Sequence, residues 1–448
     1  MRLLFVHRHL GELGGAEANI HLTAEQLGRR GHMTGLLYGS ATGKGEDQWR
    51  ATFSECFRLP GYRNGTATQR ALEYFTPDVL WVHNLSDLEV LEALLQSPKP
   101  VIRTVHDHAL YCMRSYKYDY FTRQICLRPA STYCIFPCLA SVSRNHRGGL
   151  PLKWVSYSAK RQEIRLNQHC RRLIVFSDYI RQELLRNGFD GPRIEVHAPL
   201  FREGGGGKLG VGSWEEDEAR QSCSPLSPNS QPPSSTPLPS SNLIVWAGQI
   251  VRGKGLDLFL RALTHVKTNF ECAILGDGSH RAYCEKLSKK LGLSGRVKFY
   301  GFVGPEQLQE FFCKASLFAF SSVWPEPFGM AGPEAMRHGL PVVAFDAGAV
   351  REWLTDGANG FLVPWGNTNL FGVRIEQLLQ NRDLAQTMGR CARERVAREF
   401  NPDRAIERLD DLLFRVVQET QTAASSQQSE NFLNYEQRTV RTIASAPL

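Results

Sequence analysis

The sequence predicts an α/β protein built from two Rossmann-like domains that face each other across a cleft. Three observations point to this fold class. At 448 residues the chain is too long for a single hydrophobic core. Short β-branched runs alternate with longer helical patterns, which is typical of parallel sheets joined by crossover helices. A Pro- and Ser-rich stretch interrupts the alternation once, so we expect one domain on each side of it.

The first domain is expected over residues 1–202. Its clearest helix, 16–30, places Ile20, Ala24 and Leu27 on one face and ends before Gly31, because glycine is common directly after a helix. Runs rich in β-branched residues predict the strands of its sheet. These strands are Leu3–Val6, Met33–Tyr38, Val79–His83, Val101–His106 and Leu173–Phe176.

The second domain is expected over residues 243–400, where the same alternation returns. Its expected strands are Leu243–Ala247, Cys272–Leu275, Val297–Tyr300, Leu317–Phe320 and Val342–Phe345. Its expected helices are Leu256–His265, Arg281–Leu291, Glu306–Ala315 and a segment from about Gly329 to His338.

Three further segments lie outside these domains. Residues 203–242 contain GGGG and SPLSPNSQPPSSTPLPSS, and this composition predicts a disordered insertion. Residues 401–419 predict an amphipathic helix whose apolar stripe, Ile406, Leu409, Leu413 and Val416, has to pack on another part of the protein. Residues 420–448 are rich in Gln, Ser and Thr and predict a flexible tail.

Composition predicts a soluble, cytoplasmic protein. Hydrophobic residues make up 42% of the chain, and no apolar run approaches the roughly 18 residues needed to cross a bilayer. The run Leu3–Val6 is too short for a signal peptide. The net charge of +8 leaves a solvated basic face and a membrane-surface patch as equal alternatives. No nucleic-acid-binding motif accompanies the charge, so a nucleic-acid partner is not expected.

The first glycine turn argues against a dinucleotide cofactor. It reads Gly11-Glu-Leu-Gly14-Gly15-Ala-Glu17 rather than G-x-G-x-x-G, and no acidic residue follows the second strand at Tyr38. Gly14 and Gly15 still open a helix, so their backbone N–H groups are candidates for anion binding.

The most specific motif is the stretch from Trp324 to Met336, which places Glu334 eight positions after Glu326. If a helix begins at Gly329, its first N–H groups suit a diphosphate. Phosphate would repel a nearby carboxylate, so Glu326 is expected to bind neutral sugar hydroxyls. Glu334 can accept two hydrogen bonds from a vicinal diol such as a ribose.

This stretch resembles the E-x7-E signature of the family 4 retaining glycosyltransferases, which adopt the GT-B fold. The resemblance spans most of the chain apart from the insertion and the tail. It includes Gly248–Gly255, Gly276–Gly278, Gly301–Val303, Gly339–Val343, Gly360–Val363, Gly14–Glu17, Gly31–His32 and Thr104–Asp107. It implies a retaining hexosyltransferase that moves a sugar from a GDP- or UDP-sugar to a glycan or lipid-linked acceptor, as in polysaccharide biosynthesis. It also implies that the helix at 401–419 crosses back to the first domain.

The resemblance assigns roles to matching positions. Glu334 would hold the donor ribose, Glu326 the transferred sugar, and Lys254 the leaving diphosphate, while His106 would lie near the reacting sugar. Further donor contacts are implied at Gly276, at Phe302 and Val303 beside the nucleobase, and at the main chain of Phe328, Gly329, Met330 and Ala331. The other histidines, including His7, His83 and His108, have no comparable context.

One position departs from the family pattern. The family has Arg directly after the first glycine of the G-x5-K-G element, whereas this chain has Gln249, with Arg252 three positions later as a substitute from the same loop. Replacing a charge-assisted hydrogen bond with a neutral one weakens phosphate binding by about 1–2 kcal/mol.

No two aspartates stand two positions apart, so the chain lacks a D-x-D motif for a metal–diphosphate bridge. We therefore expect an active site without metal and no cofactor beyond the nucleotide sugar, with the leaving charge offset by Lys254 and a helix N-terminus. Outside this site, Cys112, Cys126, Cys134 and Cys138 fall within 27 residues. A structural zinc ion and four unlinked thiols are equal alternatives for them.

Two other functions remain open on the sequence. A nucleotide-sugar epimerase uses the same fold, and a non-catalytic nucleotide-sugar-binding protein would explain the unusual Gln249. A labelled sugar nucleotide separates the three, because it is transferred or slowly hydrolysed, epimerised, or left unchanged.

Overall fold

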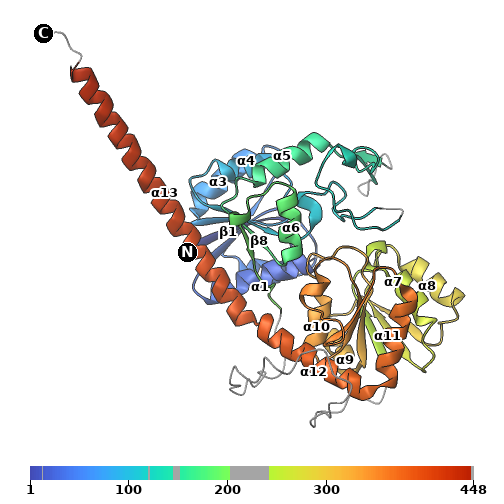
Figure 1. The fold of residues 1–448 in the computed structure, drawn as a ribbon. Helices are drawn as coiled ribbons and strands as arrows, with labels where there is room; N and C mark the ends of the chain where they lie inside the picture. Colours follow the sequence, from blue (N-terminus) through green and yellow to red (C-terminus); the bar gives the residue numbers. More distant parts are fainter. Residues whose placement is uncertain (13, 120–121, 145–151, 202–241, 445–448) are drawn as a thin grey trace.

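The computed structural model contains two parallel β-sheets with helices packed on both faces of each (Figure 1). It describes residues 1–12, 14–119, 122–144, 152–201 and 242–444. The insertion expected at 203–242 lies, apart from Asn242, outside the described residues. The two-domain α/β class that the sequence predicts is confirmed, with strands β1–β9 within residues 1–202 and β10–β15 within 243–400.

The N-terminal sheet has seven parallel strands in the order β3-β2-β1-β4-β5-β8-β9. The strands are β1 (Arg2–Leu10), β2 (Met33–Ala41), β3 (Glu55–Arg58), β4 (Val79–Val82), β5 (Val101–Val105), β8 (Arg172–Val175) and β9 (Ile194–Val196). The helices are α1 (Gly15–Arg29), α2 (Glu46–Thr52), α3 (Asn64–Phe75), α4 (Leu88–Leu95), α5 (Tyr157–Asn167) and α6 (Asp178–Arg186). The sequence missed the edge strands β3 and β9, because β3 has no buried residue and β9 is only three residues long.

A less regular segment connects β5 to α5 in this domain. It contains two 3-10 turns, η1 (His108–Leu110) and η2 (Thr132–Cys134), and an antiparallel hairpin of β6 (Val142–Arg144) and β7 (Leu152–Trp154). This segment extends to the upper right in Figure 1.

The C-terminal sheet has six parallel strands in the order β12-β11-β10-β13-β14-β15. The strands are β10 (Leu243–Ala247), β11 (Glu271–Leu275), β12 (Val297–Gly301), β13 (Leu317–Phe320), β14 (Val342–Phe345) and β15 (Gly360–Val363). The helices are α7 (Leu256–Leu263), α8 (Arg281–Lys290), α9 (Pro305–Lys314), α10 (Ala331–Arg337), α11 (Thr368–Gln380) and α12 (Arg382–Glu399). The strands predicted from the sequence did not include β15. This strand begins at Gly360, where a Cβ atom would lie only 2.1 Å from the Val342 carbonyl oxygen.

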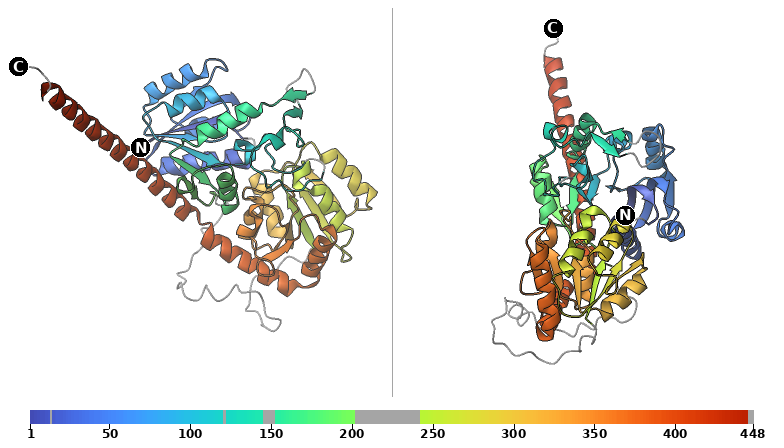
Figure 2. Two further views of the ribbon diagram at one scale, coloured as in Figure 1. Left: turned by 45° about the horizontal axis from the view of Figure 1, so that its top comes forward. Right: turned by 90° about the vertical axis from the view of Figure 1, so that its right-hand side faces the viewer.

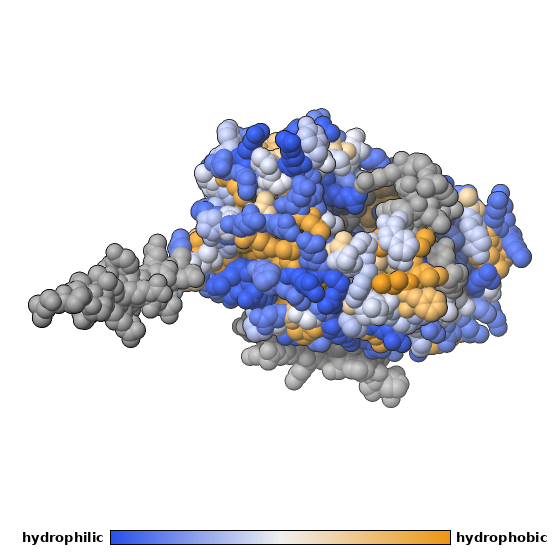
Figure 3. Space-filling view, turned by 90° about the horizontal axis from the view of Figure 1, so that it is seen from above, coloured by the Kyte–Doolittle hydropathy of each residue, from blue (hydrophilic) through white to orange (hydrophobic). Residues whose placement is uncertain are grey.

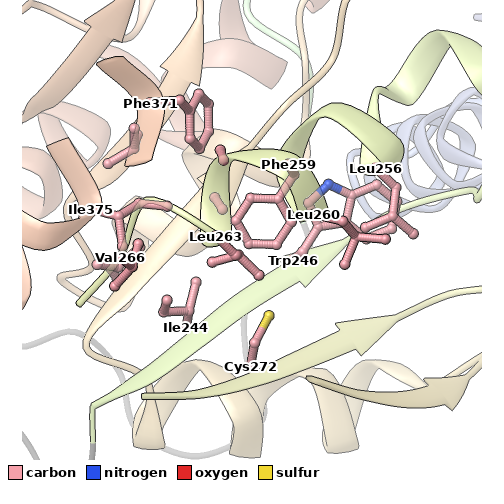
Figure 4. Close-up of a cluster of buried hydrophobic side chains, with 14 of the residues drawn as sticks. Ile244, Trp246, Leu256, Phe259, Leu260, Leu263, Val266, Cys272, Phe371 and Ile375 are labelled. Atoms are coloured by element: carbon pink, nitrogen blue, oxygen red, sulfur yellow. The ribbon is translucent and has the colours of Figure 1, made fainter. Parts of the chain in front are cut away.

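One face of this sheet is covered by α7 and α11, which form a continuous apolar core with β10 (Figure 4). Trp246 on β10 and Phe259 on α7 are at most 2% exposed, and Phe371 on α11 is fully buried. Because β10 is central, this core fixes the positions of the loops that follow the middle strands.

The last helix, α13 (Pro402–Ala444), crosses from the C-terminal domain to the N-terminal domain (Figures 1 and 2). Its buried face joins the core around α1. That face consists of Ile406, Leu409, Leu412, Leu413 and Val416. Nε2 of His32 lies 2.9 Å from Oδ1 of Asp410, which adds a polar contact at this interface.

The backbone of α13 continues well past residue 419, where the sequence predicts that a flexible tail begins. In Figure 1 the helix extends beyond the N-terminal domain as a straight rod. Between Pro402 and Pro447 the chain contains neither glycine nor proline, so no residue in this stretch breaks the helix. Among the described residues, no helix has both the length and the apolar character needed to span a bilayer.

Candidate active site

The candidate site lies between the carboxyl ends of the two sheets, which is where open α/β sheets bind ligands. From the N-terminal domain come the turn after β1 and the residues after β4 and β5. From the C-terminal domain come the loops after β10, β11, β12 and β13. Direct contacts join the two sides: Nε2 of His108 is 2.7 Å from the Pro325 carbonyl oxygen, and the Ser177 hydroxyl donates to the Pro327 carbonyl oxygen.

The structure brings Lys254 and Glu326 together as an ion pair. Lys254 ends the 3-10 turn η4 (Arg252–Lys254) after β10, while Glu326 follows β13. Nζ of Lys254 is 2.7 Å from Oε1 of Glu326 and 5.2 Å from the centre of the Trp324 ring. Because Glu326 is only 3% exposed, the ammonium group supplies the countercharge that a buried carboxylate needs. Arg252 begins the same turn.

Glu334 occupies the fourth position of α10, in an environment unlike that of Glu326. Burial raises the pKa of Glu334 to about 7, although the positive charge of Arg337 opposes this rise. Within the part of the chain that the structure describes, its carboxylate makes no hydrogen bond. The helix begins at Ala331, two residues later than expected, so Gly329 and Met330 belong to the preceding loop.

The Trp353 side chain packs against the loop before α10 and fixes its position. The indole Nε1 of Trp353 donates to the Phe328 carbonyl oxygen at 2.6 Å. A Cβ atom at Gly332 would stand 2.3 Å from the same ring, so only glycine lets the helix pack this closely. Gly329 has a φ of +89°, which favours glycine for a second reason. These contacts fix the main chain from Phe328 to Gly332.

Glycines also allow the loops after β10 and β11 to approach each other. A Cβ atom at Gly276 would lie 1.9 Å from the Gly248 carbonyl oxygen, and one at Gly278 would lie 2.5 Å from the Ile250 carbonyl oxygen. After β12, the Phe302 side chain is 84% exposed, whereas Val303 packs against the core. An accessible Phe302 next to an anchored Val303 leaves this turn open to a ligand.

The glycine turn of the first domain faces the loop that contains Gln249. Gly14 is the N-cap of α1, and a Cβ atom at Gly14 would be 3.8 Å from Nε2 of Gln249. A Cβ atom at Gly15 would meet nothing within 4 Å, so space is open in front of the helix. The exposed Gln249 amide therefore lies beside the start of α1.

Buried histidines line the edge of the N-terminal sheet. His106 follows β5 and His83 follows β4, and a 3.0 Å hydrogen bond joins Nε2 of His106 to Nδ1 of His83. Burial, followed by the charge of His7, lowers the pKa of His106 to about 3, so its ring is neutral at neutral pH. Nε2 of His7 lies 3.3 Å from Oε1 of Glu17.

Neither His83 nor His108 was predicted from the sequence to have a role in the site. The signal for His83 was its place after β4, because β4 and β5 are neighbours in the sheet and their following residues must adjoin. His108 contacts Pro325 as described above, and burial lowers its pKa to about 4. A contact between residues 217 positions apart leaves no local pattern in the sequence.

For the four clustered cysteines, the described structure shows unlinked thiols that are not gathered as metal ligands. Cys112, Cys126, Cys134 and Cys138 are free thiols. Across the described residues, no three His, Cys, Asp or Glu side chains gather as they would around a metal ion. Charged side chains hold this segment instead: Arg114 donates to the Cys138 carbonyl oxygen at 2.7 Å, and Nζ of Lys117 lies 3.1 Å from Oε2 of Glu183.

Comparison with known protein families gives two matches, which together cover both domains. Residues 13–199 match the family described as Glycosyltransferase Family 4. Residues 230–395 match the family described as Glycosyl transferases group 1.

Curated relatives align with part of the chain. An uncharacterised glycosyltransferase of Methanocaldococcus jannaschii is 28% identical over 36% of this chain and 42% of its own length. The lipopolysaccharide core biosynthesis glycosyltransferase LpsE of Rhizobium meliloti is 28% identical over 36% of this chain and 46% of its own length. The chain thus spans less than half the length of these curated relatives.

Solved structures share the fold over nearly the whole chain. Anabaena HepE, solved in complex with UDP and glucose, has a TM-score of 0.67 at 18% identity and covers 93% of this chain and 100% of its own. Sucrose-phosphate synthase from Thermosynechococcus elongatus has a TM-score of 0.65 at 15% identity and covers 93% of this chain and 98% of its own. With both halves matched and the fold shared throughout, the chain belongs to glycosyltransferase family 4 and has the GT-B fold.

Proposed function

We propose that the protein transfers a sugar from a UDP- or GDP-sugar to a glycan or lipid-linked acceptor with retention of the anomeric configuration. The observation that carries the proposal is the ion pair between Lys254, on the loop after β10, and Glu326, on the loop that leads from β13 to Glu334. Relatives support both nucleotides. HepE was solved with UDP, and a Mycobacterium tuberculosis relative, 27% identical over 38% of this chain, is a GDP-mannose-dependent mannosyltransferase.

In the proposed reaction, negative charge grows on the diphosphate as its bond to the sugar breaks. Lys254 would offset this charge, and the backbone N–H groups from Phe328 to Ala331 would add hydrogen bonds. Glu326 would accept hydrogen bonds from sugar hydroxyls, because its own charge is balanced by Lys254. The pKa of His106 is about 3, so its ring is neutral at neutral pH. It would therefore bind the sugar without adding charge.

The remaining donor contacts follow the same chemistry. Glu334 would accept two hydrogen bonds from the ribose diol, and the base would lie along Phe302 and Val303. Gln249 would offer a neutral amide to the diphosphate where the family has Arg. We therefore expect Gln249→Arg to tighten donor binding, unless Arg252 already occupies that space.

The test is steady-state kinetics with a panel of nucleotide sugars that carry a labelled sugar. Lys254→Ala should lower kcat on the order of 100-fold or more, because it removes a charge that acts mainly in the transition state. Lys298→Ala is the matched control, since Lys298 is 59% exposed on β12 and should leave kcat unchanged.

Lys254→Ala also leaves the buried Glu326 carboxylate unpaired, which can destabilise a fold by about 3–5 kcal/mol. The double variant Lys254→Met/Glu326→Gln removes both charges and should recover stability but not turnover. A Lys254→Ala enzyme with wild-type kcat would refute the assignment. Epimerised donor, or donor bound but never consumed, would replace the proposal with one of the two alternative functions.

A further inference from the structure

His83 and His106 meet in the interior of the N-terminal domain. Nδ1 of His83 lies 3.0 Å from Nε2 of His106, and the ring centres are 5.3 Å apart. Hydrophilic side chains cover much of the molecular face shown in Figure 3, whereas these two polar rings are only 2% and 9% exposed. Because solvent barely reaches the hydrogen bond between them, it is electrostatically stronger than one at the surface.

The packing around His83 fixes the direction in which its ring points. The His83 backbone N–H donates to the Val6 carbonyl oxygen at 2.9 Å, which continues the pairing of β4 with β1. The His83 ring stacks on Phe5 with the ring centres 5.4 Å apart, and on Trp81 with the centres 5.5 Å apart. The ring therefore cannot turn its Nδ1 away from His106 without disrupting a closely packed core.

Both rings are neutral, so the hydrogen bond between them has two proton arrangements. Burial lowers the pKa of His83 well below its ordinary value, and burial also lowers the pKa of His106 to about 3. Each neutral imidazole has one N–H group and one nitrogen without a proton. Either His83 donates from Nδ1, or His106 donates from Nε2.

The second ring nitrogen of His83 distinguishes these two arrangements. Within the described residues, Nε2 of His83 is buried and has no hydrogen-bond partner. If His106 were the donor, the proton of His83 would lie on this Nε2, and a buried N–H group without an acceptor is rare in native proteins. If His83 donates instead, its Nε2 is an unpaired acceptor, which is less unusual. The proton of His106 is then on Nδ1.

We propose that His83 is a positioning residue that keeps the proton of His106 on Nδ1, so that His106 donates a hydrogen bond to the transferred sugar. The inference rests on the proposed function, in which His106 binds this sugar. Because Nε2 of His106 already accepts from His83, Nδ1 is the ring nitrogen that remains for the sugar. The opposite tautomer would present an Nδ1 without a proton, which can only accept a hydrogen bond. His83 thus sets the direction of a sugar contact that it does not itself make.

The position of the proton is measured on the full chain with isotope-labelled histidine. A proton–nitrogen correlation spectrum through two bonds shows which nitrogen of each neutral ring is protonated, and His106→Gln identifies the His106 signals by their absence. We expect Nδ1–H in the wild type and a larger share of Nε2–H in His83→Leu. A His106 ring protonated on Nε2 in the wild type would overturn the inference. This measurement needs neither donor nor turnover.

Two substitutions of nearly equal shape separate the hydrogen bond from the packing. In His83→Asn the amide nitrogen takes the place of Nδ1 and still donates, whereas His83→Leu keeps apolar packing but offers no donor. We expect His83→Leu to lower kcat/KM for the nucleotide sugar roughly three- to tenfold, because one neutral hydrogen bond to the sugar is lost, and His83→Asn to stay within about twofold of the wild type. Affinity for the free nucleoside diphosphate should not change in either variant.

Thermal unfolding should rank the two variants in the opposite order, because asparagine packs less well than leucine between the Phe5 and Trp81 rings. Activity that follows stability, with His83→Leu more active than His83→Asn, would contradict the positioning role. A loss of affinity for the free nucleoside diphosphate would contradict it as well, because it would mean that the whole site had shifted.

His21 provides the matched control. It is a buried histidine of the same domain, its ring stacks on Trp49 with the centres 5.5 Å apart, and its Nε2 lies 2.8 Å from the Thr52 hydroxyl oxygen. His21→Leu should cost stability and leave kcat/KM unchanged, so an equal loss of kcat/KM in His21→Leu and His83→Leu would also overturn the inference. If the wild type turns over no nucleotide sugar, the proposed function fails, while the spectrum still decides which nitrogen of His106 is protonated.

Discussion

At the scale of single residues, the two glutamates of the E-x7-E element differ sharply in environment. Glu326 is paired with Lys254, whereas the Glu334 carboxylate makes no hydrogen bond in the described structure and has a pKa of about 7. A carboxyl group with a pKa of about 7 changes its charge around neutral pH. Its ionised form is also the form that best accepts two hydroxyl hydrogen bonds.

The raised pKa of Glu334 predicts that the stability of the protein depends on pH, and that Glu334→Gln removes this dependence. The pKa of Glu334 is raised from 4.5 to about 7 in the donor-free fold. Its contribution is therefore fully present below about pH 4.5 and is lost as the pH rises through about 7. In thermal unfolding without donor, Glu334→Gln should match the wild type near the lower pH and exceed its Tm above the upper one.

The control for this measurement is Glu306→Gln, because Glu306 is an exposed glutamate in the first turn of α9. It should shift Tm little and evenly across the same pH range. A Glu334→Gln difference that stays constant with pH would show that Glu334 ionises normally in the donor-free protein.

At the scale of elements, α13 packs on the N-terminal domain through one stripe of buried apolar side chains. Leu412 and Leu413 are fully buried against the N-terminal domain, while Phe414 on the same turn is 50% exposed. The helix starts beside the C-terminal domain, so its packing ties the ends of both domains together.

We expect Leu412→Ala and Leu413→Ala each to lower the free energy of unfolding by about 2–5 kcal/mol, because each leaves a cavity in a closed core. Phe414→Ala is the matched control and should cost less than about 1 kcal/mol, since its side chain is half exposed. Urea unfolding measures all three. Equal costs for the three variants would mean that α13 does not pack in the orientation described.

At the scale of the whole molecule, the two domains are held together on both sides of the candidate site. The Arg123–Asp257 pair lies on one side. On the other, the Glu352 carboxylate accepts hydrogen bonds from the Asp178 and Tyr179 backbone N–H groups at 2.9 and 2.8 Å, at the start of α6. Each contact joins the N-terminal domain to the C-terminal domain, so both should break when the cleft opens.

Removing these contacts should favour an open arrangement of the domains. We expect Asp257→Asn/Glu352→Gln to increase the radius of gyration measured by small-angle X-ray scattering without donor, and to raise KM more than it changes kcat. Arg351→Gln is the control, because Arg351 pairs with Asp346 inside its own domain. An unchanged radius of gyration in the double variant would show that other contacts set the closed form.

The sequence by itself determined the fold class, the positions of most strands and the family resemblance, because these depend on local patterns. Leu243–Ala247, Leu317–Phe320 and Val342–Phe345 were predicted at their observed bounds, since each is a short run of apolar residues between turn residues. The glycines of the loops could also be identified from the sequence, because they belong to short local motifs.

Only the tertiary structure decided which of these residues meet. Lys254 and Glu326 are 72 positions apart, and His83 and His106 are 23 apart, so no spacing rule predicts their pairing. The tertiary structure also shows the four clustered cysteines as free thiols in a segment that Arg114 and Lys117 hold in place. It shows that α13 continues past the expected end. Local propensity specifies elements, whereas the contacts between distant side chains follow from how the buried faces of those elements pack.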